Sequence, residues 1–204
     1  MDAITLLKQD HRTVEKLFKQ FEKAGDNAHK SKRKIVDKII EELSKHAAIE
    51  EQVFYPAVRG EVEDAEDLTL EALEEHHVVK WTLSELEGMP ADHERFDAKV
   101  TVLIESVRHH VEEEEGEMFP EVRKELGRKR LGKIGEEMES LKAIAPTRPH
   151  PKAPDEPPAN LITNTGAGIV DQAKSSAKKL QKAEKPEKAR SKTKTQGKKA
   201  LIGS

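Results

Sequence analysis

The sequence predicts an all-α fold, an antiparallel up-down-up-down four-helix bundle with a short extra helix and a disordered C-terminal tail. Four segments carry apolar residues at steps of three and four, and no stretch alternates as a strand would. Hydrophobic residues make up 35% of the chain and charged residues 37%, which favours exposed amphipathic helices over a large buried sheet. Helices of ~20 residues joined by short connections suit such a bundle.

The charge divides the chain into two parts. Residues 1–144 carry 23 lysine and arginine residues against 34 aspartate and glutamate residues, a net charge of −11, and they hold all seven aromatic residues. Residues 145–204 carry 13 basic residues against 5 acidic ones, a net charge of +8. We therefore expect an acidic folded domain over residues 1–144 and a mostly disordered basic tail over residues 145–204.

The four long helices follow from their apolar stripes. The first stops near Gly25, and the second begins near Ser31, a candidate N-cap, and runs to Pro56. The third ends near Gly88, and the fourth ends before Pro120. In chain order the stripes consist of Ile4, Leu7, His11, Val14, Phe18 and Phe21; Ile35, Ile39, Leu43, His46, Glu50 and Val53; Leu73, His76, Val79, Leu83 and Leu86; and Phe96, Val100, Leu103, Val107, His110, Glu114 and Met118.

A fifth, shorter pattern predicts the extra helix, which would cap or extend the bundle. Its apolar positions run from Leu131 to Leu141, although Gly132 and Gly135 weaken its helix propensity. After Ala145 the stretch PTRPHPKAPDEPPAN predicts a proline-rich linker. Beyond it, GIVDQAKSSAKKLQKAEK could form a weak amphipathic helix, and the lysine-rich end is expected to be disordered.

Some classes of site and location are disfavoured by composition. The absence of cysteine excludes disulfides, thiolate metal sites and thiol catalysis. No apolar run approaches the ~20 residues needed to cross a bilayer, and the N-terminus lacks the pattern of a signal peptide. We therefore expect a cytoplasmic protein that is not transmembrane.

Every predicted helix of the bundle places a histidine on its apolar stripe, and two helices add a glutamate four residues later. Burying an unpaired carboxylate costs several kcal/mol even after relaxation, so polar groups directed at one interior need a common compensation. A metal centre supplies one. The six candidate ligands are His11, His46, Glu50, His76, His110 and Glu114.

An internal repeat strengthens this interpretation. The phrase HAAIEEQVFYP begins at His46, and HVEEEEGEMFP begins at His110. His11 precedes His46 by 35 residues and His76 precedes His110 by 34, so the chain consists of two similar hairpins. Together they would supply four imidazoles and two carboxylates, and the carboxylates can bridge two metal ions. Nitrogen and oxygen ligands suit iron or manganese better than calcium or magnesium, while zinc is harder to exclude.

The pattern DH…HxxxEExxFYP…EH…HxxxEExxFP resembles the hemerythrin-like, or HHE cation-binding, domain family over about residues 1–125. The resemblance implies an antiparallel four-helix bundle with a non-haem di-iron centre of two iron ions, which binds or senses dioxygen or meets related oxidants. It also implies that the four histidines are terminal ligands and that Glu50 and Glu114 are bridges.

The sequence departs from the oxygen-carrying hemerythrins in the third helix. Their third helix offers two histidines at HxxxH spacing, whereas here Lys80 follows His76 by four residues and Ala72 precedes it by four. The chain therefore resembles the members used for iron or oxygen sensing and for oxidant handling, and the departure argues against reversible oxygen carriage.

Several residues admit two interpretations. His77 competes with His76 as a ligand, although the repeat spacing favours His76. Glu51 and Glu115 either accept hydrogen bonds from ligand imidazoles or lie on a solvated face. Tyr55 could pack the end of the bundle or hydrogen-bond a bound oxygen species.

Three functions fit these observations. The first is a non-haem di-iron protein that binds or senses oxygen, peroxide or nitric oxide, or handles iron. The second is a peroxide-decomposing, catalase-like di-iron enzyme, which is less favoured because no dedicated general base is evident. The third is a structural bundle with adventitious metal, in which the tail makes the functional contact. In each case the tail could bind nucleic acid or an anionic membrane weakly, or only solubilise the protein.

Overall fold

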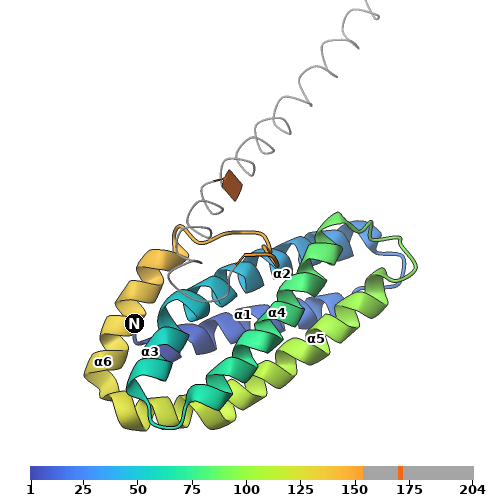
Figure 1. Cartoon of the computed structure of the whole chain (residues 1–204). Helices are drawn as coiled ribbons and strands as arrows, with labels where there is room; N and C mark the ends of the chain where they lie inside the picture. The colour runs from blue at the N-terminus through green and yellow to red at the C-terminus, as the bar shows by residue number, and fades with distance from the viewer. Residues whose placement is uncertain (154–169, 172–204) are drawn as a thin grey trace, which may run out of the picture.

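A computed structural model describes residues 1–153 and 170–171, and within this part of the chain it is helical without strands. Four long helices lie side by side, and two further helices cover one end of them near the N-terminus (Figure 1). The predicted all-α bundle is confirmed. The elements in chain order are α1 (Ala3–Glu22), α2 (His29–Ile49), η1 (Glu50–Phe54), α3 (Tyr55–Glu61), α4 (Glu66–Gly88), α5 (Phe96–Glu113), η2 (Glu114–Met118) and α6 (Phe119–Lys142), where η marks a π-helical turn.

The first two helices begin differently. The carboxylate of Asp2 caps α1, accepting hydrogen bonds from the Thr5 amide at 2.9 Å and the Thr5 hydroxyl at 2.8 Å. Helix α2 begins at His29, and its N-cap Ala28 offers no side-chain hydrogen bond. The prediction of Ser31 as the N-cap was therefore wrong.

The predicted stops at Pro56 and Pro120 were also wrong. Each proline lies in the first turn of a new helix, α3 or α6, and a π turn joins that helix to the one before it. Proline fits there because the first turn of a helix does not need its missing N–H. The extra helix predicted near Leu131 is the second half of α6, which begins at Phe119 and is kinked at Gly127, where φ is +65°.

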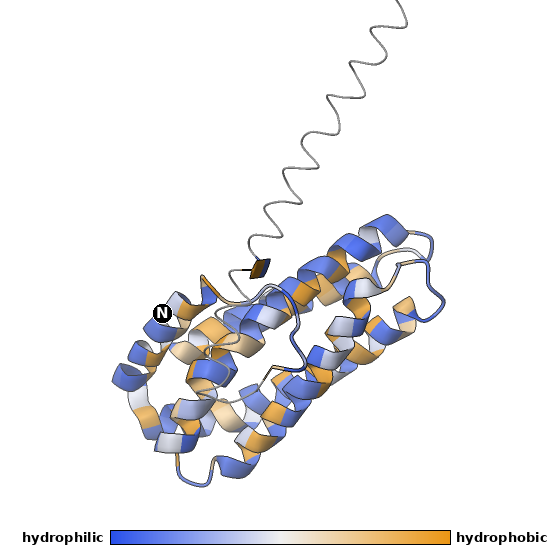
Figure 2. Cartoon of the chain, turned by 45° about the horizontal axis from the view of Figure 1, so that its top comes forward, coloured by the Kyte–Doolittle hydropathy of each residue, from blue (hydrophilic) through white to orange (hydrophobic). Residues whose placement is uncertain are grey.

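The interior consists of two apolar clusters at opposite ends of the bundle, and Figure 2 shows the apolar residues on the inner faces of the helices. The first cluster lies under α3 and α6 and includes Phe54 and Phe119. The second fills the other end and includes Phe18 and Phe96. Between the clusters, each long helix carries one of the stripe histidines, so a polar layer crosses the middle of the bundle.

The chain continues past α6 along the bundle. Ala145 is buried, and the Arg148 guanidinium forms an ion pair with Glu87 of α4. The boundary at residue 144 stays a prediction, and the expected amphipathic helix and lysine-rich end lie outside the described residues except for Val170 and Asp171. No helix in the described part is long and apolar enough to span a membrane.

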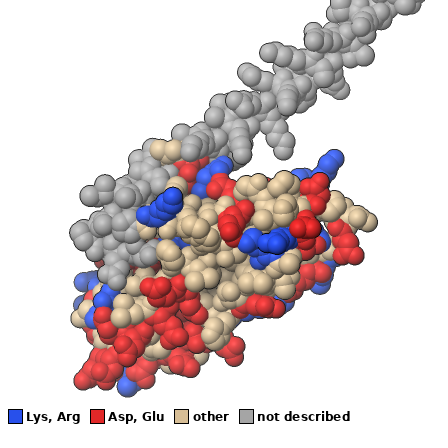
Figure 3. Space-filling model, turned by 45° about the vertical axis from the view of Figure 1, so that its right-hand side comes forward, with Lys and Arg blue, Asp and Glu red and all other residues tan. Residues whose placement is uncertain are grey.

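The surface is predominantly acidic. Figure 3 shows aspartate and glutamate side chains crowded over the lower end of one face, with basic side chains scattered among them. This agrees with the net charge of −11 for residues 1–144.

The packing of α6 on the start of α1 depends on Gly135. A Cβ atom at Gly135 would collide with the Met1 backbone oxygen and lie 2.8 Å from the Ala3 amide nitrogen. Gly135→Ala should therefore lower the free energy of unfolding by ~1–3 kcal/mol through overpacking. Gly132→Ala is the matched control, because nothing lies within 4 Å of its Cβ position. It should raise the free energy of unfolding by ~0.5–1 kcal/mol through helix propensity. Urea unfolding followed by circular dichroism measures both, and equal effects would contradict the close approach.

Candidate metal centre

The structure brings all six predicted residues together in the polar layer between the two apolar clusters. Each side chain is 5% exposed or less. One histidine comes from each of α1, α2, α4 and α5, and the glutamates come from η1 and η2. The two hairpins therefore meet as the repeat predicted, although the role of the six residues as metal ligands stays a prediction. The six are His11, His46, Glu50, His76, His110 and Glu114.

Both glutamates begin a π turn. Glu50 is the first residue of η1, and Glu114 is the first residue of η2. These turns occupy the same place in the two halves of the repeat. π turns are uncommon and are often found at functional sites, so their duplication at this layer marks it as more than packing.

The first possible metal position is formed by His11, His46, Glu50 and Glu114, each of which offers one ligand atom within 4.8 Å of the others. His46 Nε2 lies 3.1 Å from Glu50 Oε2, and His11 Nε2 lies 3.3 Å from Glu114 Oε2. The rings of His11 and His46 meet edge to face, with centroids 4.9 Å apart.

The second possible position is formed by Glu50, His76 and His110. His76 Nε2 lies 3.4 Å from Glu50 Oε2 and 3.2 Å from His110 Nε2. Glu50 belongs to both groups, whereas Glu114 belongs only to the first. A pair of metal ions would therefore share Glu50, and the second ion would have fewer protein donors than the first.

Two carboxylates orient the histidines of α1 and α4 from outside. His11 Nδ1 donates to Glu115 Oε1 at 2.8 Å, and His76 Nδ1 donates to Glu51 Oε1 at 3.1 Å. The sequence left open whether Glu51 and Glu115 accept hydrogen bonds from imidazoles or lie on a solvated face, and in the structure both accept from imidazoles. A carboxylate can only accept, so each Nδ1 carries the proton and each Nε2 presents a lone pair to the interior.

Asp10 and Glu75 serve the other two histidines and were missed by the sequence analysis. His110 Nδ1 donates to Glu75 Oε2 at 2.8 Å. Asp10 Oδ2 lies 3.7 Å from His46 Nδ1, longer than a hydrogen bond, and Lys142 of α6 pairs with the same carboxyl group. The signal was available, because Asp10 and Glu75 occupy the same place in the repeat, each directly before a stripe histidine.

Lysines neutralise two of these outer carboxylates. Lys80 Nζ lies 2.8 Å from Glu51 Oε1 in the interior, and Lys8 Nζ lies 3.1 Å from Glu115 Oε2 nearer the surface. Lys80 is only 7% exposed. It therefore acts on the Glu51–His76 pair from within the interior.

Several buried atoms of the six residues have no hydrogen-bond partner among the described residues. One of them, Nδ1 of His46, lies on the side of Asp10. The others are both carboxylate oxygens of Glu50, Oε2 of Glu114 and Nε2 of His11. Glu50 Oε2, Glu114 Oε2 and His11 Nε2 have polar neighbours at 3.1–3.6 Å, but without hydrogen-bond geometry, so lone pairs face lone pairs. Buried polar groups are seldom left in this state, and a cation among them would satisfy all of these atoms at once. The residues present therefore fit a metal centre.

The pKa values of the buried histidines and glutamates also favour a metal centre. Burial raises the pKa of Glu50 well above its ordinary value, and the charge of Glu114 adds to the rise. Burial would also raise the pKa of Glu114, but the charge of His110 lowers it. Burial lowers the pKa of His46 to about 4 and that of His76 well below its ordinary value. The imidazoles of His46 and His76 are therefore neutral and available as ligands, and the two carboxylates need a proton or a cation between them.

Tyr55 breaks the symmetry of the two halves. Its hydroxyl donates to Glu114 Oε1 at 2.9 Å and lies 3.3 Å from His76 Nε2. Burial raises the pKa of Tyr55 well above its ordinary value, so the phenol keeps its proton. Phe119 has the equivalent place in the other half and stacks on His11, with centroids 5.9 Å apart. A proton donor thus lies on one side of the group only.

The structure distinguishes the two adjacent histidines. His76 is 4% exposed and lies within the group, whereas His77 is exposed on the outer face of α4. His109 is likewise on the surface, with its side chain 65% exposed.

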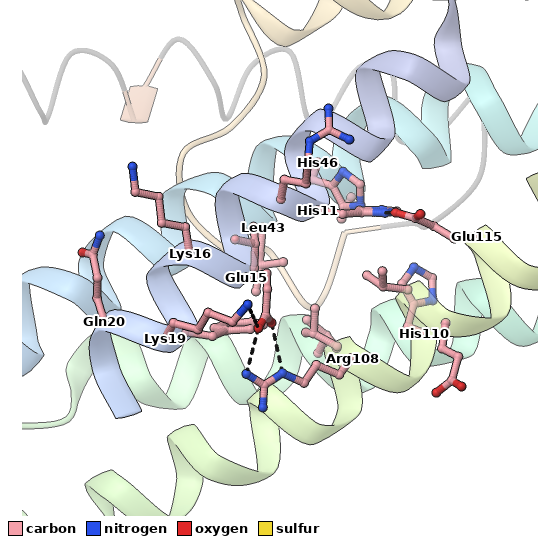
Figure 4. A pocket seen from close by; sticks show the side chains of 18 of the residues that line it. His11, Glu15, Lys16, Lys19, Gln20, Leu43, His46, Arg108, His110 and Glu115 are labelled. Atoms are coloured by element: carbon pink, nitrogen blue, oxygen red, sulfur yellow. Dashed lines mark hydrogen bonds and ion pairs between the residues drawn. The ribbon is translucent and has the colours of Figure 1, made fainter. Parts of the chain in front are cut away.

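A cavity of about 890 Å³ between α1 and α5 reaches the group from solvent. Figure 4 shows His11, His46 and His110 at its inner end and the Arg108–Glu15 ion pair across it. His76 also lines the cavity. Small molecules can therefore approach the four histidines through this opening.

Comparison with known proteins adds four findings. The family model described as the hemerythrin HHE cation binding domain matches residues 2–122. An uncharacterized hemerythrin-like protein of Schizosaccharomyces pombe is 27% identical over 164 residues, which cover 80% of each chain. A DNA nickase of Nostoc sp. is 25% identical over 143 residues, 70% of this chain but only 40% of the nickase. The crystal structure of a hemerythrin HHE cation binding domain-containing protein from Mycobacterium kansasii has a TM-score of 0.61 at 25% identity, covering 70% of this chain and 86% of that chain.

The pKa of His46 predicts how metal-stripped protein responds to acid. His46 stays neutral in the folded state down to a pKa of about 4, while an unfolded histidine takes up a proton below its ordinary pKa of 6.5. Its contribution to stability is therefore complete above pH 6.5 and is lost as the pH falls towards 4, on the order of 3 kcal/mol. His46→Gln should flatten the loss of unfolding free energy over this range in urea titrations. His109→Gln, at an exposed position, should keep the wild-type slope, and an unchanged slope in His46→Gln would contradict the prediction.

Proposed function

The chain belongs to the hemerythrin HHE cation-binding domain family, and on that premise we propose that it is a non-haem di-iron protein that binds or senses oxygen, peroxide or nitric oxide, or handles iron. The observation that carries the proposal is the buried group of four imidazoles and two carboxylates, in which both Glu50 oxygens, Glu114 Oε2 and His11 Nε2 lack hydrogen-bond partners among the described residues. We propose as ligands His11, His46, Glu50, His76, His110 and Glu114.

The donor set supports two iron ions. Imidazole nitrogens with carboxylate oxygens suit iron or manganese, and the chain has no cysteine to favour softer metals. Glu50 belongs to both candidate groups, which supports a shared, dinuclear centre. Iron bound there would coordinate a small oxidant or a diatomic gas and would exchange electrons with it.

The protein's own residues have three tasks in this proposal. The outer carboxylates accept hydrogen bonds from the Nδ1–H groups of three histidines and so direct the Nε2 atom of each of these inward. The pairs are His11 with Glu115, His76 with Glu51 and His110 with Glu75. The apolar clusters shield the layer at both ends of the bundle. Tyr55 holds a proton at its hydroxyl beside the group that has fewer donors, where it can donate a hydrogen bond to an incoming oxygen species.

A catalase-like activity is the second candidate function. Tyr55 favours it, because a peroxide that reaches the centre needs a proton donor at hand and the cavity gives access from solvent. Steady-state oxygen evolution from hydrogen peroxide by iron-loaded protein separates an enzyme from a binding or sensing protein. A change in the optical spectrum on peroxide addition without turnover would favour binding or sensing.

The basic tail supports a separate proposal. Residues 145–204 carry a net charge of +8, and one relative is named a DNA nickase. We propose that the tail makes a weak, electrostatic contact with nucleic acid or an anionic membrane. A cytoplasmic location of the protein stays a prediction.

Metal analysis tests the proposed centre. Iron-reconstituted wild-type protein should hold about two iron ions per chain, because each hairpin gives two imidazoles and one carboxylate. His76→Ala should lose at least one ion and change the optical spectrum. His77→Ala, the adjacent matched control, should keep both ions and the spectrum. One tightly bound ion in wild-type protein would refute the dinuclear centre, and the reverse result for the two variants would assign the ligand to His77.

Deletion of the tail tests the second proposal. A chain ending at Ala153 keeps Arg148 and its ion pair with Glu87, and it should hold the same iron as the full chain. Full-length protein should bind duplex DNA or phosphatidylserine vesicles at low salt and release them as salt rises, because the contact is screened over ~10 Å at 0.1 M. The shortened chain should bind neither. Equal, weak binding by both chains would leave the tail as a solubilising appendage.

A further inference from the structure

The cavity between α1 and α5 is larger than access for a diatomic gas requires. Helix α1 packs on α2 and α6 and helix α5 packs on α4, so the α1–α5 side of the bundle is where the cavity of about 890 Å³ remains. This volume lies in the range of ~300–1,000 Å³ typical of small-molecule sites. Along α1 the lining extends from His11 to Lys23, about 18 Å at the helical rise. The cavity is therefore long enough for an extended chain.

Its floor is apolar and is built by all four long helices. Val14 and Phe18 come from α1, Leu43 from α2, Val79 from α4 and Val107 from α5. All are buried and belong to the second apolar cluster. An apolar chain lying on this floor would extend the existing core and would leave no polar group unpaired.

The border of the cavity is basic although the domain is acidic. Five lysine and arginine residues line it against three glutamates, whereas residues 1–144 as a whole carry a net charge of −11. Glu15 is already paired with Arg108 and with Lys19. Lys16 of α1 and Lys23, which directly follows α1, make no ion pair with any residue that the structure describes. This border would attract a negatively charged group.

We propose that the α1–α5 cavity binds a free long-chain carboxylic acid. Its alkyl chain would lie on the floor of Val14, Phe18 and Val107, and its carboxylate would lie at the α1 border near Lys16 or Lys23. Because Lys16 and Lys23 are positively charged, they favour an anion and disfavour the chain's own tail, which is also basic. This site lies beside the proposed metal centre and does not require iron.

Calorimetric titration of full-length, iron-loaded protein with octanoate, decanoate and dodecanoate tests the proposal. The dissociation constant should fall by up to ~4-fold for each added methylene group, because each one is buried on the apolar floor. Dodecyltrimethylammonium, with the same chain and the opposite charge, should bind at least ten-fold more weakly. No binding, or no dependence on chain length, would overturn the proposal.

Three variants locate the site. Val107→Phe should fill the floor and abolish binding, with its helix content and iron content checked against wild type. The double variant Lys16→Glu/Lys23→Glu should weaken binding about ten-fold by reversing the charge of the border. Lys38→Glu, an exposed position of α2 outside the cavity, is the matched control and should bind as wild type. Unchanged binding in Val107→Phe or in the double variant would overturn the assignment to this cavity.

Two further outcomes name other occupants. Binding that disappears when iron is removed would assign the carboxylate to the metal centre and overturn its placement at the α1 border. A synthetic peptide of residues 168–185 that enters the cavity in competition assays, where dodecanoate does not, would assign the cavity to the chain's own tail. Both results are independent of the proposed function, because the iron content and the peroxide response are measured separately.

Discussion

The structure depends on the burial of two carboxylates, Glu50 and Glu114, in the middle of a helical bundle. Both are at most 1% exposed, and most of their oxygens have no hydrogen-bond partner among the described residues. Such groups are costly to bury unless a positive charge lies among them. Burial keeps the imidazoles of His46 and His76 neutral, so these two cannot supply that charge. The fold is therefore organised around a place for a cation.

The surroundings of this layer hold most of its imidazoles in position. Three of the four histidines donate Nδ1–H to a carboxylate from another helix, and lysines in turn pair with Glu51 and Glu115. These three imidazoles are thereby restrained from two sides, by their own helices and by a neighbour. Apolar clusters above and below the layer provide the packing that these polar groups do not. The polar layer specifies the geometry, and the clusters supply most of the stability.

The two halves of the repeat are similar but not equivalent. Tyr55 places a hydroxyl beside the His76 side of the layer, while Phe119 places an apolar ring on His11. Lys80, which pairs with Glu51, is buried on α4. Lys8, which pairs with Glu115, comes from α1 and lies nearer the surface. The open side between α1 and α5 adds a further asymmetry, because the cavity there gives solvent a route to the four histidines. A small molecule that enters the layer would thus meet different side chains on its two sides, although the four histidines and two glutamates are symmetrically arranged.

The sequence by itself determined the helical class, the four stripes and the six polar residues of the layer. It could do so because helical spacing fixes which side chains share a face of one helix. Only the tertiary structure decided that Pro56 and Pro120 begin new helices after π turns, that Asp10 and Glu75 approach imidazoles of other helices, and that His76 rather than His77 faces inward. It also decided that α1 and α5 leave a cavity between them. These features arise from how one helix is rotated and spaced against another, and the periodicity of a single helix contains no information about its neighbours.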